Sequence, residues 1–165
     1  MENWMQSNLK IIYMVVGAIF LLGTAAGIYS FLELRNSGRT YIDPADKSLV
    51  NLGEEIYQTN CAACHGVNLE GQPNWRTKNP NGRMPAPPHD KTGHTWHHPD
   101  AILFSITKFG ITPGKTAPKG YESDMPAFSE ILEDQKITAV IAYIKSTWPE
   151  KVQEAQKEVT YETQK

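Results

Sequence analysis

The only two cysteines of this 165-residue chain lie within five consecutive residues, 61–65, which read CAACH. Cys61 and Cys64 are three positions apart, so on a helix both thiols lie on the same face. His65 follows the second cysteine directly. Side chains of these types at this spacing can form a disulfide, bind a metal ion, or attach a prosthetic group through thioether bonds.

Of these three chemistries, only the attachment of haem accounts for every member of the motif. A thioredoxin-type disulfide belongs to a chain that alternates strands and helices, and no segment here has the period-two pattern of a strand. A structural zinc ion needs a fourth ligand at a comparable spacing. The pattern C-x-x-C-H is typical of c-type haem, whose two vinyl groups react with the two thiols. The motif therefore predicts one covalently attached haem c on Cys61 and Cys64, with its iron bound by His65.

The second axial ligand of the iron has several candidates in the sequence. Met125 lies in a loop before the last predicted helix, and Pro126 stiffens that loop, which helps to hold a weak thioether ligand. We expect Met125 to be this ligand. Met84 also precedes a proline and stays a candidate. The others are the histidines of one loop, His89, His94, His97 and His98, which also leave open a second site for copper or zinc, beside ordinary loop and capping roles.

Helices at both ends of a long loop region are expected to position these side chains. The residues DPAD at 43–46 predict a helix start with Asp43 as the cap. Apolar residues then recur with helical spacing, so this helix runs into the cysteine motif. The same kind of pattern predicts helices over residues 99–109 and 134–147. Prolines and glycines are concentrated in residues 66–120, which predicts a loop-rich middle.

The amino-terminal segment is strongly hydrophobic. Residues 11–32 contain no charged side chain, and as a helix they would be about 33 Å long, enough to cross the hydrocarbon core of a membrane. The competing interpretation is a secretory signal peptide with the small residues 23–26 as its cleavage region. Because the apolar run continues beyond those residues, we predict an uncleaved, single-pass anchor. Haem c is attached outside the cytoplasm, so the remainder of the chain is expected on the periplasmic or extracellular side of the cell (inner) membrane.

The predicted organisation has four parts: the anchor 1–32, a linker 33–42, a haem domain 43–148, and a charged tail 149–165 that we expect to be a frayed helix. The net charge of −2 gives no sign of nucleic-acid binding. The charge is uneven, because residues 66–119 carry seven basic and three acidic side chains while residues 120–165 carry five and nine. We expect a basic surface around the haem edge that attracts an acidic partner.

Three stretches that follow one another in order, GEEIYQTNCAACHG, YESDMPAF and ITAVIAYIKSTW, resemble the class I cytochromes c. The similarity covers residues 49–148 and is greatest to bacterial membrane-anchored cytochromes with one haem. It implies an all-α fold in which Gly53 allows the first and last helices of the haem domain to approach closely. It also implies that Met125 is the distal ligand. A carbonyl of the proline-rich loop, for which we expect that of Pro87, would accept the Nδ1–H of His65.

The resemblance implies an electron carrier and not an enzyme, because two axial ligands leave no free position on the iron for a substrate. We therefore predict a membrane-tethered monohaem cytochrome c that carries single electrons between respiratory membrane complexes, such as a terminal oxidase or a quinol–cytochrome c reductase. Trp75, Trp96 and Tyr121 are candidate hydrogen-bond donors to the haem propionates. The alternative is a haem-based sensor or a small peroxidase-like enzyme, in which Met125 would have to leave the iron.

Overall fold

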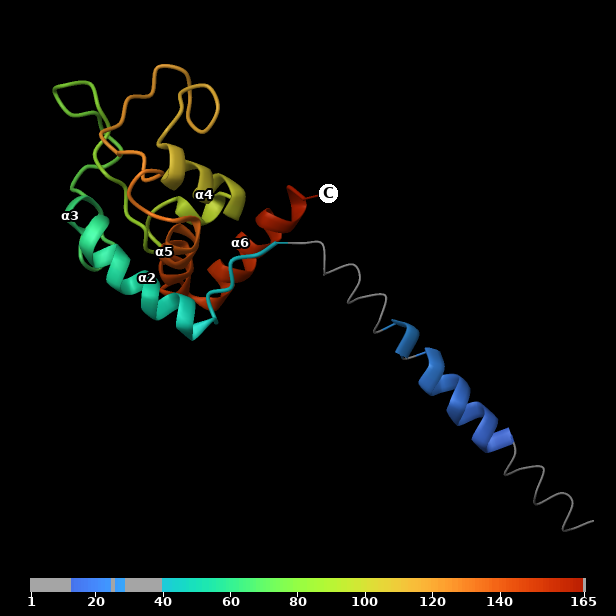
Figure 1. Cartoon of the computed structure of the whole chain (residues 1–165). Coiled ribbons are helices and arrows are strands. Elements are labelled where there is room, and N and C mark those ends of the chain that lie inside the picture. The colour runs from blue at the N-terminus through green and yellow to red at the C-terminus, as the bar shows by residue number, and fades with distance from the viewer. Residues whose placement is uncertain (1–12, 25, 29–39, 165) are drawn as a thin grey trace, which may run out of the picture. The chain divides into compact units, whose positions relative to one another are not determined.

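The computed structural model describes residues 13–24, 26–28 and 40–164, and helices make up the regular structure in them (Figure 1). The chain divides into two units, residues 1–40 and 41–165. Within the described ranges there is no β-strand, and the only strand-like pairings are two isolated bridges between loops, Met84 with Ser123 and Pro113 with Ala117. The predicted all-α architecture is therefore confirmed for this part of the chain.

Helix α2, Lys47–Asn60, leads into the cysteine motif, but it begins later than predicted. Its cap is Asp46, whose Oδ1 accepts hydrogen bonds from the backbone N–H groups of Ser48 and Leu49 at 3.0 and 3.1 Å. The predicted cap, Asp43, instead accepts from the N–H of Ala45 at 2.9 Å and closes a turn. The prediction of Asp43 was wrong because two aspartates one turn apart can both cap, and the structure uses the second.

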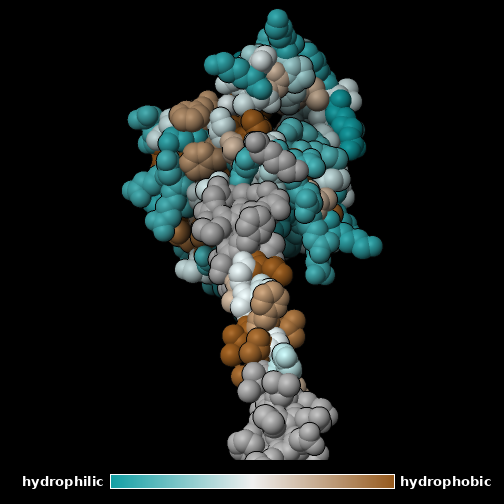
Figure 2. Space-filling view, turned by 90° about the vertical axis from the view of Figure 1, so that its right-hand side faces the viewer, coloured by the Kyte–Doolittle hydropathy of each residue, from teal (hydrophilic) through white to brown (hydrophobic). Residues whose placement is uncertain are grey.

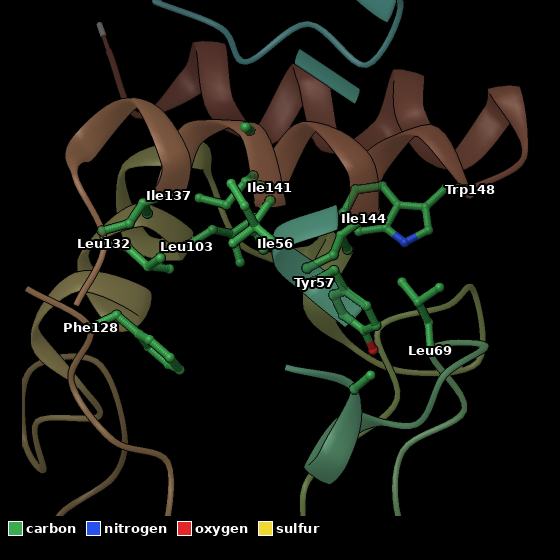
Figure 3. Packing of buried hydrophobic residues seen from close by; sticks show 13 residues of the cluster. Ile56, Tyr57, Leu69, Leu103, Phe128, Leu132, Ile137, Ile141, Ile144 and Trp148 are labelled. Carbon is green, nitrogen blue, oxygen red and sulfur yellow. The ribbon is translucent and has the colours of Figure 1, made fainter. Parts of the chain in front are cut away.

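Helices α2 and α5, Asp134–Ser146, form the centre of the larger unit. They cross at Gly53, where a Cβ atom would lie 2.0 Å from the carbonyl oxygen of Ala139 and 2.9 Å from Cβ of Tyr143. Only glycine permits this approach, which confirms the implied role of Gly53. Apolar side chains from α2, α5 and the segments around them form one core beneath the crossing (Figure 3), with Ile56, Tyr57, Leu103, Phe128, Leu132, Ile137, Ile141, Ile144 and Trp148 among its members.

Three shorter elements complete the haem-domain segment: α3, Ala62–His65; a 3₁₀ helix, η1, Thr95–His97; and α4, Asp100–Phe109. The predicted helices over 99–109 and 134–147 are both confirmed to within one residue at each end. Figure 1 shows long loops between α3 and α4 and between α4 and α5, and the first of these loops returns through η1 to α6.

The last helix, α6, covers Glu150–Glu162 and is not the frayed tail that the sequence predicted. Its Gln156 and Thr160 side chains are completely buried. The Nε2 of Gln156 donates to Oδ1 of Asp100 at 2.7 Å and to Oγ1 of Thr160 at 3.0 Å. Polar side chains on α6 therefore dock this helix, although its pattern of charges suggested a solvent-exposed one.

The end of the predicted linker, residues 33–42, also belongs to the folded unit. The N–H of Ile42 donates to Oδ2 of Asp100 at 2.7 Å, and the ring of Tyr41 lies 3.7 Å from Nζ of Lys145. Residues 33–39 of the linker lie outside the described residues. The folded unit thus includes Tyr41 and Ile42, which the sequence had assigned to the linker.

In the amino-terminal unit, residues 13–24 and 26–28 are helical. Their apolar side chains are exposed, with Phe20 and Leu22 each 71% accessible, and Figure 2 shows hydrophobic surface along this segment. Among the residues that the structure describes, no helix has both the length and the apolar character needed to cross a bilayer. The predicted anchor, 1–32, extends outside the described residues at both ends, so it stays a prediction.

Candidate functional site

The cysteine motif lies where α2 ends and the short helix α3 begins. The N–H of His65 donates to the carbonyl of Cys61 at 2.9 Å, so residues 61–65 form one helical turn. Both thiols are free: Cys61 is half-buried and Cys64 is exposed. Burial raises the pKa of the Cys61 thiol to about 11, with a smaller contribution from Cys64. The two thiols are thus available on one turn of helix for two thioether bonds.

His65 is the best-defined ligand in the site. Its side chain is only 6% exposed, and its Nδ1–H donates to the carbonyl of Pro87 at 2.9 Å. This confirms the expected partner and fixes the tautomer, because a ring that donates through Nδ1 keeps a lone pair on Nε2 for a metal. Burial lowers the pKa of His65, although the bond to Pro87 acts in the opposite direction. The ring is therefore held neutral, as a metal ligand must be.

The carbonyl of Pro87 is held in place by the segment that follows the motif. Gln72 braces the proline-rich loop twice, since its N–H donates to the carbonyl of Ala86 at 2.9 Å and its Oε1 accepts from the N–H of Ala86 at 3.0 Å. Gly71 has φ +68°, and a Cβ there would lie 2.4 Å from the nitrogen of Pro88. Glycine at this position thus allows the backbone to approach the loop that orients His65.

One of the three candidate propionate donors is distinguished by its surroundings. Nε1 of Trp96 is buried and, within the described part of the chain, has no hydrogen-bond partner. An indole N–H can only donate, and leaving it buried and unpaired costs about 1–3 kcal/mol. A haem propionate is an acceptor that would satisfy it. The residues present therefore fit the predicted prosthetic group: two free thiols, an imidazole with an available Nε2, and an indole N–H without a partner.

The two candidate methionines lie on neighbouring loops. Met84 donates its N–H to the carbonyl of Glu122 at 3.3 Å and pairs with Ser123 in an isolated bridge. Met125 follows two residues later, with its N–H bonded to Oγ of Ser123 at 3.1 Å. Met125 is partly buried against the hydrophobic core, which is consistent with an inward-facing side chain. The choice of Met125 over Met84 stays a prediction.

The histidine loop shows ring contacts and no metal site. The rings of His94 and His98 lie 5.4 Å apart, and Trp75 stacks on His94 at 5.6 Å. No group of three potential ligands among histidine, cysteine, aspartate and glutamate comes together in residues 13–24, 26–28 and 40–164. The open alternative of a second copper or zinc ion thus finds no three-ligand group in these ranges.

The uneven charge is partly neutralised within the fold. Arg83 pairs with Asp124 and with Glu122, and Nζ of Lys108 lies 2.6 Å from Asp134. Two basic residues of the positive segment therefore bind acidic residues of the negative one. The basic surface expected from the sequence is smaller than the sequence count suggests.

Sequence reasoning missed His89 as part of the site. It grouped this residue with the loop histidines, but the structure places its ring 4.0 Å from that of His65. The available signal was position: His89 follows Pro87 by two residues, so the same loop that supplies the carbonyl also brings His89 to the ligand.

The comparisons with known proteins agree with this geometry. The sequence profile of one protein family, described as Cytochrome c, matches residues 50–148. This range contains the cysteine motif, the proline-rich loop, η1, α4 and α5, and it stops before α6. No curated protein and no solved structure matches the chain.

Proposed function

The chain belongs to the cytochrome c family, and from this premise we propose that it carries single electrons through a haem iron ligated by His65 and Met125. Proteins of this family carry covalently attached haem c, and Cys61 and Cys64 are the matching pair of thiols. When bound, the haem supplies an iron that accepts and releases one electron. Haem-based electron transfer is the function that the family supports.

The observation that carries the proposal is the hydrogen bond from the buried ring of His65 to the carbonyl of Pro87. The bond from its Nδ1–H to the Pro87 carbonyl sets the ring orientation and makes Nε2 a stronger donor. A ligand held in this way moves little when the charge on its metal changes, which suits electron transfer. The buried N–H of Trp96 adds a donor that can compensate a propionate charge.

Met125 is proposed to occupy the second axial position. Its loop is tied to the neighbouring loop through Ser123 and Glu122, and its side chain packs against the core. A thioether ligand stabilises the reduced iron and raises the reduction potential. It also leaves no free position for a gas or a peroxide, which favours an electron carrier over a sensor or a peroxidase-like enzyme.

Replacing each methionine in turn tests this assignment. In Met125→Ala we expect loss of the weak long-wavelength absorption band that ferric iron shows when bound to thioether sulfur, a lower midpoint potential, and rapid binding of carbon monoxide to the reduced protein. Met84→Ala is the matched control and should keep the wild-type spectrum. If the band survives in Met125→Ala and disappears in Met84→Ala, the distal ligand is Met84.

We further propose that residues 1–32 anchor the protein in the cell membrane, with the haem domain on the periplasmic or extracellular side. The uncharged run 11–32 and the exposed apolar side chains of residues 13–24 support this. A tether would keep the domain near membrane redox complexes, such as a terminal oxidase or a quinol–cytochrome c reductase, and raise its effective concentration there.

Membrane extraction tests the anchor. The full chain should remain in the membrane after an alkaline carbonate wash and dissolve only in detergent. A matched chain in which a cleavable export signal replaces residues 1–32 should be haem-loaded and soluble. Release of the full chain by carbonate alone would contradict the anchor without affecting the assignment of the haem ligands.

A further inference from the structure

His89 lies against the iron ligand and has no part in the function described so far. Its ring and that of His65 are 4.0 Å apart between centroids and inclined by 22°, so the two imidazoles stack nearly face to face. The two rings are therefore in contact over their faces.

Three hydrogen bonds to three different segments hold His89 in place. Its N–H donates to the carbonyl of Leu69 at 2.8 Å, and its carbonyl accepts from Nε1 of Trp148 at 2.7 Å. Its Nδ1 is hydrogen-bonded to Oγ1 of Thr95 at 2.8 Å. The backbone of His89 and one nitrogen of its ring are therefore held by the fold before any ligand binds.

We propose that His89 is a positioning residue that fixes the ring plane of the iron ligand His65 through this stack. The bond to Pro87 restrains one atom of the His65 ring but leaves rotation about that bond. A flat, immobile ring against one face removes this rotation. The inference rests on the proposed function, because it concerns the same iron ligand.

The orientation of an axial imidazole can be measured by spectroscopy. If His89 only stabilised the fold, its replacement would not change this signal. The plane of the ring determines how the unpaired electron of ferric low-spin iron is distributed between two perpendicular directions. The g values in electron paramagnetic resonance and the shifts of the haem methyl protons in nuclear magnetic resonance both report this distribution. Neither depends on a redox partner.

The test compares two replacements of His89 in the haem-bearing protein. His89→Phe keeps a flat ring and should keep g values and methyl shifts close to the wild-type ones. His89→Leu removes the ring and should shift the largest g value and change the spread of the methyl resonances. Lys91→Leu, at an exposed residue of the same loop, is the control and should match wild type.

A measurement on the unaltered protein supports the test if the variants fold poorly. In the reduced, diamagnetic state, proton–proton cross-peaks between the rings of His65 and His89 are expected. Their absence, or wild-type g values in a folded His89→Leu, would overturn the inference. Failure of the proposed function would be seen separately, as absence of covalently bound haem or of His65 ligation in the wild type.

Discussion

Two polar centres in the folded unit differ in how their hydrogen-bonding atoms are used. Around His65 the fold leaves functional atoms open: Nε2 of His65 is available, and Nε1 of Trp96 is buried without a partner among the described residues. Around Asp100 the side chains bind mainly to one another, and we call this group the closed centre, although Oε1 of Gln156 is also buried without a partner among the described residues. The first centre therefore offers groups that a prosthetic group can bind, whereas the second joins segments of the fold through an ion pair and hydrogen bonds.

The closed centre joins segments that are distant in sequence. Nζ of Lys145 lies 2.7 Å from Oδ1 of Asp100, and both side chains are buried, with 0% and 7% exposed. Oδ1 of Asp100 also accepts from Gln156 on α6, and its Oδ2 accepts from the N–H of Ile42. Ile42 and α6 both lie outside the range that matches the cytochrome c family. The closed centre thus joins Asp100 and Lys145, which lie within the matched range, to residues on both sides of it.

Breaking the closed centre should have the largest effect. Asp100→Ala leaves the charge of Lys145 buried without its partner, so we expect the free energy of unfolding to fall by about 3–5 kcal/mol. Urea denaturation followed by helical circular dichroism measures this. The double replacement Asp100→Leu with Lys145→Met removes both charges and should cost clearly less than the sum of the two single changes. Additive losses would show that the pair does not act as a unit.

Trp148 and Trp96 allow a comparison between an indole N–H that has a hydrogen-bond partner and one that has none among the described residues. Trp148→Phe leaves the partly buried carbonyl of His89 without its donor, and we expect a loss of about 1–3 kcal/mol in the free energy of unfolding. Trp96→Phe removes an N–H that has no protein partner in the described residues. It should lower the midpoint potential instead, because a propionate charge without its donor stabilises ferric iron. Electrochemical titration checks the second expectation; an unchanged potential would mean that Trp96 does not bind a propionate.

The smallest effect is expected from pH, through the histidines beside the open centre. Burial lowers the pKa of both His94 and His98. Below a pH of about 6.5 the unfolded chain therefore binds protons that the folded chain does not, and stability should fall as pH falls through this region and be constant above it. Thermal unfolding from pH 7.5 down to pH about 5 measures the slope. The double variant His94→Gln with His98→Gln should show a shallower fall, and an identical slope would assign the effect to other groups.

The parts of the site that the sequence predicted are those with local causes. The CAACH motif lies on one helical turn, whereas the carbonyl of Pro87 was expected from the resemblance to the class I cytochromes c. The helices around Gly53 followed from apolar spacing. Where two residues carried the same local signal, the sequence did not decide between them. Both Asp43 and Asp46 can cap a helix, and the structure uses Asp46 and not Asp43.

The parts that the sequence did not predict depend on contacts between distant residues. Lys145 stands within an apolar helix, and its partner Asp100 lies in the first turn of α4, 45 positions earlier. Gln156 and Thr160 looked like surface residues of a charged helix because helical periodicity marks apolar faces only. The stack of His89 on His65 likewise needs the folded loop, since spacing alone says nothing about ring planes.

The hydrogen bond between Ile42 and Asp100 determines which part of the folded unit first bears a force applied to the chain before Tyr41. A pull on the chain before Tyr41 is first resisted by the bond from the Ile42 N–H to the buried carboxylate, which is itself held by Lys145 and Gln156. Helices α4, α5 and α6 share that force. The loop that orients His65 is joined to the same path, since Gln156 also donates to the carbonyl of His98, so tension applied at the amino-terminal side would reach the surroundings of the metal.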